Sequence, residues 1–269
     1  MSQITKDKQP NIAALPPRET LSSGTSKGRY KNLHLWMIIP MIIMQLGIFR
    51  DYWGDFTENA WSVHVHYWTG TAWYLYLILQ PYYAMHGQIA KHRTNGIIGM
   101  FVAGGVCLTA LSMMHRDIVT TQKAAETPAN FGPFQPWFFF AVAAVEIVMM
   151  TAFAYAVIKS IIHRKQMEHH AWWLISTVFI IMMPALGRGI QNVYVAANIK
   201  SWPNINIMAP IYLTQVLIIA MVIFSAFKFG KLKHPATYLA VGVNLFVFLM
   251  EPLGKSLAVQ SFLQTFIRG

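Results

Sequence analysis

Seven apolar stretches divide this chain of 269 residues, and each is long enough to cross a lipid bilayer. A hydrocarbon core about 30 Å thick needs about 20 apolar residues in a helix. Only 12% of the residues are charged, whereas soluble domains carry about 25%. The sequence therefore predicts an all-α bundle of seven transmembrane helices over residues 33–50, 65–89, 95–114, 135–160, 171–191, 208–230 and 236–252.

The basic residues fall unevenly on the two sides of these predicted spans. Counted by alternate sides, 14 of the 21 Lys and Arg residues lie on the same side as the N-terminus. Cytoplasmic loops of membrane proteins carry such an excess. We therefore expect a multi-pass protein of the bacterial cytoplasmic (inner) membrane, with its N-terminus in the cytoplasm and anionic lipids as partners there. The net charge of +11 follows from this topology, so nucleic acid is not an expected partner.

Less apolar sequence flanks the predicted bundle at both ends. Residues 1–32 combine three prolines with Ser, Gly and Lys, a composition typical of a disordered cytoplasmic tail. Residues 253–269 repeat apolar side chains at helical spacing, which predicts an amphipathic helix at the outer interface. The bundle itself is expected at 33–252, with its core at 65–191.

Histidine is the residue type that most clearly suggests chemistry. Six of the ten histidines adjoin span ends on the expected cytoplasmic side: His86, His92, His163, His169, His170 and His234. Facing imidazoles on neighbouring helices can ligate haem iron or a transition metal such as Fe, Zn or Cu. We expect His92 and His170 to bind haem b or such a metal, with His86 and His163 as further metal ligands. The alternative, that these rings only meet the lipid interface, stays open.

Of the charged residues within the predicted spans, Glu146 and Arg188 most suggest chemistry. Glu146 is near the middle of 135–160, where a charge costs at least about 2.5 kcal/mol. A carboxyl group there is either a proton relay or cation site, or a neutral acid hydrogen-bonded to a neighbouring helix. Arg188 follows Pro184 towards the outer end of 171–191. Its guanidinium could reach Glu146, grip a carboxylate or haem propionate, or extend to the outer headgroups. Glu146 and Arg188 are our candidate catalytic residues.

A pattern of short motifs joins several of these positions. It consists of His66, Gln80, His92-Arg93, Gly96, His170, Trp173 and Arg188. Over about residues 60–191 it resembles a family of poorly characterised bacterial integral membrane proteins. The resemblance implicates His66, His92, His170 and Arg188, with Gln80 and Trp173 beside them, but it does not supply an activity. We expect His66, Gln80, His92, His170 and Trp173 to be the cofactor-binding residues. The layout also resembles membrane b-type cytochromes, but it departs from them because His66 and His92 lie at opposite membrane faces.

Three classes of function fit these features. The first is a redox or electron-transfer protein that binds haem b or a metal and meets a membrane redox partner or a quinone. The second is a proton-coupled transporter in which Glu146 is the coupling site. The third is a non-catalytic membrane subunit of a larger complex.

Overall fold

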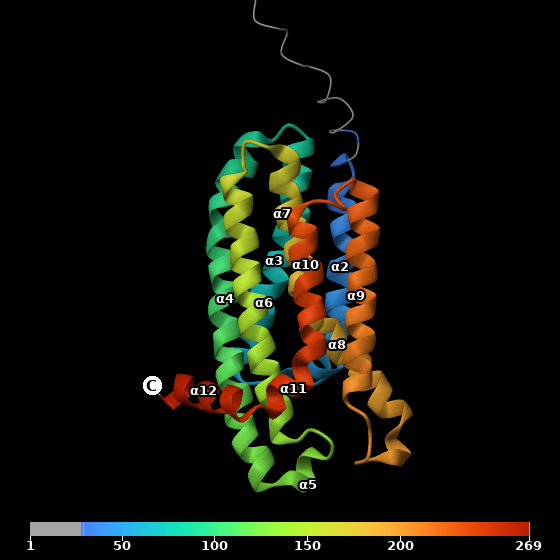
Figure 1. The fold of residues 1–269 in the computed structure, drawn as a ribbon. Coiled ribbons are helices and arrows are strands. Elements are labelled where there is room, and N and C mark those ends of the chain that lie inside the picture. The colour runs from blue at the N-terminus through green and yellow to red at the C-terminus, as the bar shows by residue number, and fades with distance from the viewer. Residues whose placement is uncertain (1–27, 29, 269) are drawn as a thin grey trace, which may run out of the picture.

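The protein is all-helical in the part that its computed structural model describes (Figure 1). That part comprises Gly28 and residues 30–268, with side chains as far as Thr265. The predicted tail at 1–32 therefore lies almost wholly outside the described residues. Within them no strand is present, which confirms the predicted all-α class.

Long helices that run alternately up and down form the bundle (Figure 1). They are α2 (Leu33–Gly47), α3 (Trp61–Met85), α4 (Ile89–Glu126), α6 (Pro136–Ile162), α7 (Met167–Ile180) followed by α8 (Met183–Ala197), α9 (Met208–Phe229), and α10 (Pro235–Phe246) followed by α11 (Met250–Lys255). Short elements join them: η1 (Phe49–Gly54), η2 (Phe56–Glu58), α5 (Pro128–Phe131), η3 (Ile199–Ser201) and η4 (Val247–Leu249). Each predicted span overlaps one of the long helices.

Five helical segments among the described residues are long and apolar enough to cross a membrane. They are α4, α6, α7 with α8, α9, and α10 with α11. Of the other two predicted spans, α2 is apolar but has only 15 residues. The 25 residues of α3 include histidines, tryptophans and tyrosines that reduce its apolar character. These helices indicate a multi-pass membrane protein.

The segment formed by α7 and α8 is the most buried of the five, with 56% of its most apolar window enclosed. α7 packs against α3, α6, α9 and α10, while α8 packs against α2 and α9. Indole N–H groups donate across these contacts, from Trp73 to Thr177 Oγ1 at 3.1 Å and from Trp172 to Thr237 Oγ1 at 2.8 Å. Buried indoles need such partners, so the two bonds hold α7 in register with α3 and α10.

α4 extends well past the end predicted for its span at residue 114. It runs for 38 residues to Glu126, a length of about 57 Å at 1.5 Å per residue. This exceeds the hydrocarbon thickness of about 30 Å, and the excess forms a projection with α5 at the lower end of Figure 1. Hydropathy predicts where a helix leaves the hydrocarbon, but the helix itself continues for as long as its backbone hydrogen bonds continue.

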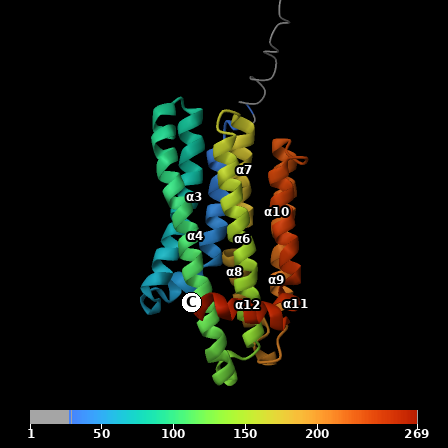
Figure 2. The ribbon, with the colours of Figure 1, turned by 60° about the vertical axis from the view of Figure 1, so that its left-hand side comes forward.

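The C-terminal helix α12 (Leu257–Arg268) crosses the lower end of the bundle transversely (Figures 1 and 2). Leu263 is buried in a cluster with Ile118 of α4 and Phe140 of α6. Leu257 and Phe262 on the same helix are exposed. This two-sided helix agrees with the amphipathic pattern of 253–269, and its location at the outer interface stays a prediction.

The two ends of the bundle carry different residues. The α3–α4, α6–α7 and α9–α10 connections lie at the upper end in Figure 1, with the histidines predicted for the inner side. η1, α5, α12 and the α8–α9 connection lie at the lower end. Below, we call these the inner and the outer end.

Candidate functional site

A cavity of about 250 Å³ lies in the outer half of the bundle, among α2, α3, α4, α6, α8, α9 and α11. Most of its wall is apolar, built from methionine, phenylalanine and aliphatic side chains. The ionisable and amide side chains on that wall are His66, Tyr67, Tyr74, Arg116, Asp117, Glu146, Arg188 and Gln191. Ionisable groups inside a membrane protein are costly and mark functional sites by default. The cavity therefore defines the candidate site.

Glu146 reaches the cavity from the middle of α6. It lies ten residues after Pro136, about 15 Å along the helix from its outer end. Among the described residues, its carboxyl group has no hydrogen bond and no ion pair within 4.0 Å. A carboxyl group at this depth without a fixed partner is free to exchange a proton or to meet a ligand.

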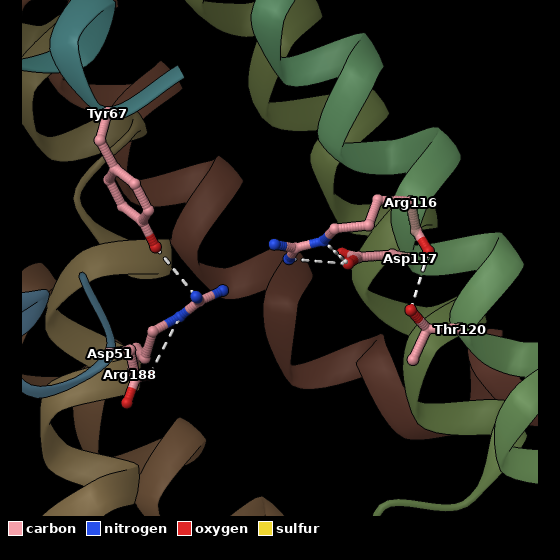
Figure 3. Close-up of polar contacts among 6 residues, drawn as sticks. All are labelled: Asp51, Tyr67, Arg116, Asp117, Thr120 and Arg188. Atoms are coloured by element: carbon pink, nitrogen blue, oxygen red, sulfur yellow. Dashed lines mark hydrogen bonds and ion pairs between the residues drawn. The ribbon is translucent and has the colours of Figure 1, made fainter. Parts of the chain in front are cut away.

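Arg188 is held on the opposite wall by groups that the sequence did not single out. Its Nη1 donates to Tyr67 Oη at 2.9 Å, and its Nε lies 3.7 Å from Asp51 Oδ2 (Figure 3). Asn192 Nδ2 donates to the other oxygen of Asp51 at 2.7 Å. Arg188 therefore lines the same cavity as Glu146 but does not form a direct ion pair with it.

Arg116 and Asp117 form a second charged pair on α4. Arg116 Nη2 lies 3.1 Å from Asp117 Oδ1, and the guanidinium points towards Arg188 (Figure 3). Both residues lie beyond residue 114, where the span predicted from the sequence ends. If the predicted helix had continued through residues 115–126, Arg116 and Asp117 would have been expected at the same depth along the bundle as Arg188.

The junction between α7 and α8 forms part of the cavity wall. α7 ends at Ile180 and α8 begins at Met183, with Pro184 in its first turn. Proline removes an N–H donor and suits the start of a helix. Ile181, Met183 and Pro184 all line the cavity. A discontinuous helix of this kind, near the middle of the bilayer, is how many transporters build a binding site.

His66 belongs to the same outer cavity. Its Nδ1 lies 3.2 Å from Thr109 Oγ1 on α4, and the ring lines the wall below Gly70 and Tyr74 of α3. The motif pattern includes His66 with His92 and His170, and His66 lies in the outer half with Arg188 and Glu146, away from His92, as its sequence position predicts.

At the inner end, His92 and His170 lie beside each other. Their ring centroids are 6.1 Å apart and the rings are nearly perpendicular. His170 Nδ1 lies 2.9 Å from the backbone oxygen of Ser160, which can only accept, and 2.8 Å from Ser160 Oγ, which can donate or accept. In the tautomer that donates from Nδ1 to the backbone oxygen, Nε2 of His170 is a free lone-pair donor, the arrangement found in metal-bound histidines. Nδ1 of His92 and both polar atoms of the Gln80 side chain are buried without a partner.

The remaining predicted metal ligands lie elsewhere at the inner end. His86 packs against Tyr82 and His34, and His163 stacks on His169, which in turn contacts His234. Trp173 meets Tyr155 and His234 through its ring edge. Among the described residues, no group of three or more His, Cys, Asp or Glu side chains has the geometry of a metal site.

Comparison with known protein families, curated proteins and solved structures finds no match for this chain.

Proposed function

We propose that this protein is a proton-coupled membrane transporter whose coupling site is Glu146. One observation carries the proposal: an unpaired carboxyl group lies midway along α6, on the wall of a charged cavity. The α7–α8 break at the same cavity supports it, because broken helices bring ligand sites and moving segments together. Protonation of Glu146 would change the charge inside the site by one unit and so bias one conformation over another.

The proposal includes seven spans and a cytoplasmic N-terminus. α2 is about 22 Å long at 1.5 Å per residue, and a tilted or locally thinned bilayer accommodates such a length at modest cost. α3 has 25 residues, enough to cross. The orientation is supported by the 14 of 21 basic residues on the N-terminal side. The bacterial inner membrane remains the proposed location.

Flux measurements in vesicles test the coupling role. The full-length protein, reconstituted into liposomes with an internal pH dye, is expected to move protons when a panel of small anions and cations is added outside. Glu146→Gln keeps the size and polarity of the side chain but cannot ionise, so it is expected to lower the flux at least tenfold. Glu126→Gln is a matched control, because Glu126 is exposed at the end of α4. Equal fluxes for the wild type and Glu146→Gln would exclude Glu146 as the coupling site.

A redox role is a second proposal, favoured by the pairing of His92 with His170. The tautomer of His170 that donates from Nδ1 to the backbone oxygen of Ser160 leaves Nε2 available, and the unpartnered polar atoms of His92 and Gln80 support a group between these helices. His92 and His170 would hold haem b or a transition metal, and haem, iron or copper would supply the electron transfer, because zinc does not change its oxidation state. Absorption spectra and metal analysis of purified protein, with His170→Gln and the control His163→Gln, test this. Absence of both a Soret band and stoichiometric Fe, Zn or Cu would remove it.

A further inference from the structure

Two arginine side chains face each other across the outer cavity (Figure 3). Arg116 extends from α4 and Arg188 from α8, and the two guanidinium groups point towards the same space. Two like charges that face each other without a charge between them repel. Such an arrangement is stabilised when an anion lies between the two groups, because guanidinium forks match the oxygens of a carboxylate.

Each guanidinium keeps donors free for that anion. Arg116 uses Nε and Nη2 on Asp117, which leaves Nη1. Arg188 uses Nη1 on Tyr67 and has Nε towards Asp51, which leaves Nη2. The side chains of Arg116 and Arg188 are 41% and 35% exposed, so a small molecule can reach both.

Oriented N–H donors also favour an anion at this site. Asp117 and Asp51 each pair with one arginine, so the N–H donors that remain free, rather than an excess of positive charge, would bind the anion. Gln191 Nε2, another donor on the cavity wall, is buried without a partner. The site therefore offers donors from three side chains to one set of acceptor oxygens.

The rest of the cavity wall favours a ligand with an apolar portion. Six methionines line the cavity, and they are Met44, Met113, Met149, Met150, Met183 and Met250. Methionine is flexible and adapts to irregular apolar shapes. An apolar cavity of about 150 Å³ holds benzene, so about 250 Å³ accommodates a ligand of roughly ten non-hydrogen atoms.

We infer that the outer cavity binds an amphipathic monocarboxylate, with its carboxylate between Arg116 and Arg188 and its apolar body against the methionine wall. This inference rests on the proposed transport function and names its substrate class. Benzoate and octanoate have the required size and charge. The corresponding amide and amine lack the negative charge that the two guanidinium groups bind.

Glu146 links this anion to a proton. A bound carboxylate and an ionised Glu146 would repel each other in the same cavity, so anion binding favours the neutral acid. The charged and titratable groups that line the cavity with Glu146 are Arg116 and Asp117 from α4, Arg188 from α8, and His66, Tyr67 and Tyr74 from α3. On α11, Glu251 and Lys255 pair with each other. The expected result is proton uptake on carboxylate binding at a pH where Glu146 is ionised in the free protein.

Calorimetry on the full-length protein in detergent tests the ligand class. Benzoate and octanoate are expected to bind, while benzamide, octylamine and inorganic phosphate bind at least tenfold more weakly. Arg116→Gln is expected to weaken benzoate binding about tenfold or more, because it removes a charged donor. Arg93→Gln removes the same charge from an exposed position at the inner end and should leave binding unchanged. Arg188→Lys keeps the positive charge but lacks the paired N–H donors of the guanidinium group. It provides a second variant should Arg116→Gln fold poorly.

The outcomes separate the ligand class from the transport function. Titrations in buffers of different ionisation enthalpy should show proton uptake in the wild type and none in Glu146→Gln. If octylamine or phosphate binds as well as benzoate, or if Arg116→Gln and Arg188→Lys both bind benzoate normally, the ligand class is wrong. If benzoate binds as expected but Glu146→Gln leaves vesicle flux unchanged, the ligand class stands and the coupling role of Glu146 fails.

Discussion

At the scale of single residues, His234 makes two hydrogen bonds, and the one that it accepts depends on its neutral form. Its Nδ1 accepts from the backbone N–H of Ala236 at 3.1 Å and so caps the start of α10. The neutral ring is then protonated at Nε2, which donates to His169 Nδ1 at 2.9 Å. Burial lowers the pKa of His234 to about 4, and nearby His169, Lys231 and His163 act in the same direction.

This cap predicts acid sensitivity at the inner end. The ordinary histidine pKa is about 6.5, so between about pH 6.5 and pH 4 the unfolded chain binds a proton that folded His234 rejects. Stability therefore falls as the pH is lowered through that window, by about 1 kcal/mol from this residue once solvent screening is allowed for. His234→Asn keeps a capping oxygen but does not titrate. We expect its thermal unfolding midpoint to change less between pH 7 and pH 4.5 than that of the wild type.

A matched variant separates the cap from histidine titration in general. His86 is exposed at the end of α3, where its Nδ1 bonds to the carbonyl oxygen of Tyr82. His86→Asn should therefore keep the pH dependence of the wild type. If His234→Asn and His86→Asn lose stability with acid as steeply as the wild type, the pH dependence comes from other groups.

At the scale of the helices, apolar length predicted where the helices are, but not where they end or bend. Bilayer thickness fixes the number of apolar residues that a span needs, so all seven predicted stretches fall on helices. The end of α4 at Glu126 was missed because a helix may continue in water beyond the hydrocarbon. That error removed Arg116 and Asp117 from the predicted site, although Glu146 and Arg188 were recognised from their charge alone.

The contact between α2 and α8 shows how closely two helices approach through glycine. A Cβ atom added at Gly47 would lie 2.3 Å from the carbonyl oxygen of Ala185, and one at Gly189 would lie 2.8 Å from Cα of Gly47. Neither backbone can move independently of its helix. Small residues at such positions allow the close packing that holds membrane helices together.

Gly47→Ala is therefore expected to push α2 away from α8 and destabilise the protein by about 1–3 kcal/mol, the usual cost of overpacking. Gly104→Ala is the control, because a Cβ there meets nothing within 4 Å and alanine favours the helix. Thermal unfolding in the same detergent compares the two. Equal midpoints for Gly47→Ala and Gly104→Ala would show that α2 and α8 do not pack this closely.

At the scale of the whole molecule, the sequence predicts at which end of the bundle a side chain lies more readily than the direction in which it points around its helix axis. Alternating spans placed His86, His92, His163 and His170 at one end of the bundle, and the structure agrees with that depth. Rotation about each helix axis then decides which rings meet, and this depends on packing between distant segments. His92 therefore meets His170, while His86 turns towards His34 and His163 towards His169.

The orientation of the bundle in the membrane can be measured directly. The chain has one cysteine, Cys107, so a Cys107→Ser background accepts single cysteines at chosen positions. Lys165 is exposed between α6 and α7, and Lys200 is exposed between α8 and α9, at opposite ends of the bundle. With a cytoplasmic N-terminus and seven spans, a membrane-impermeant maleimide added to intact cells should label Lys200→Cys but not Lys165→Cys. Both should react after the cells are broken. The reverse pattern would invert the orientation, and the carboxylate cavity would then open towards the cytoplasm.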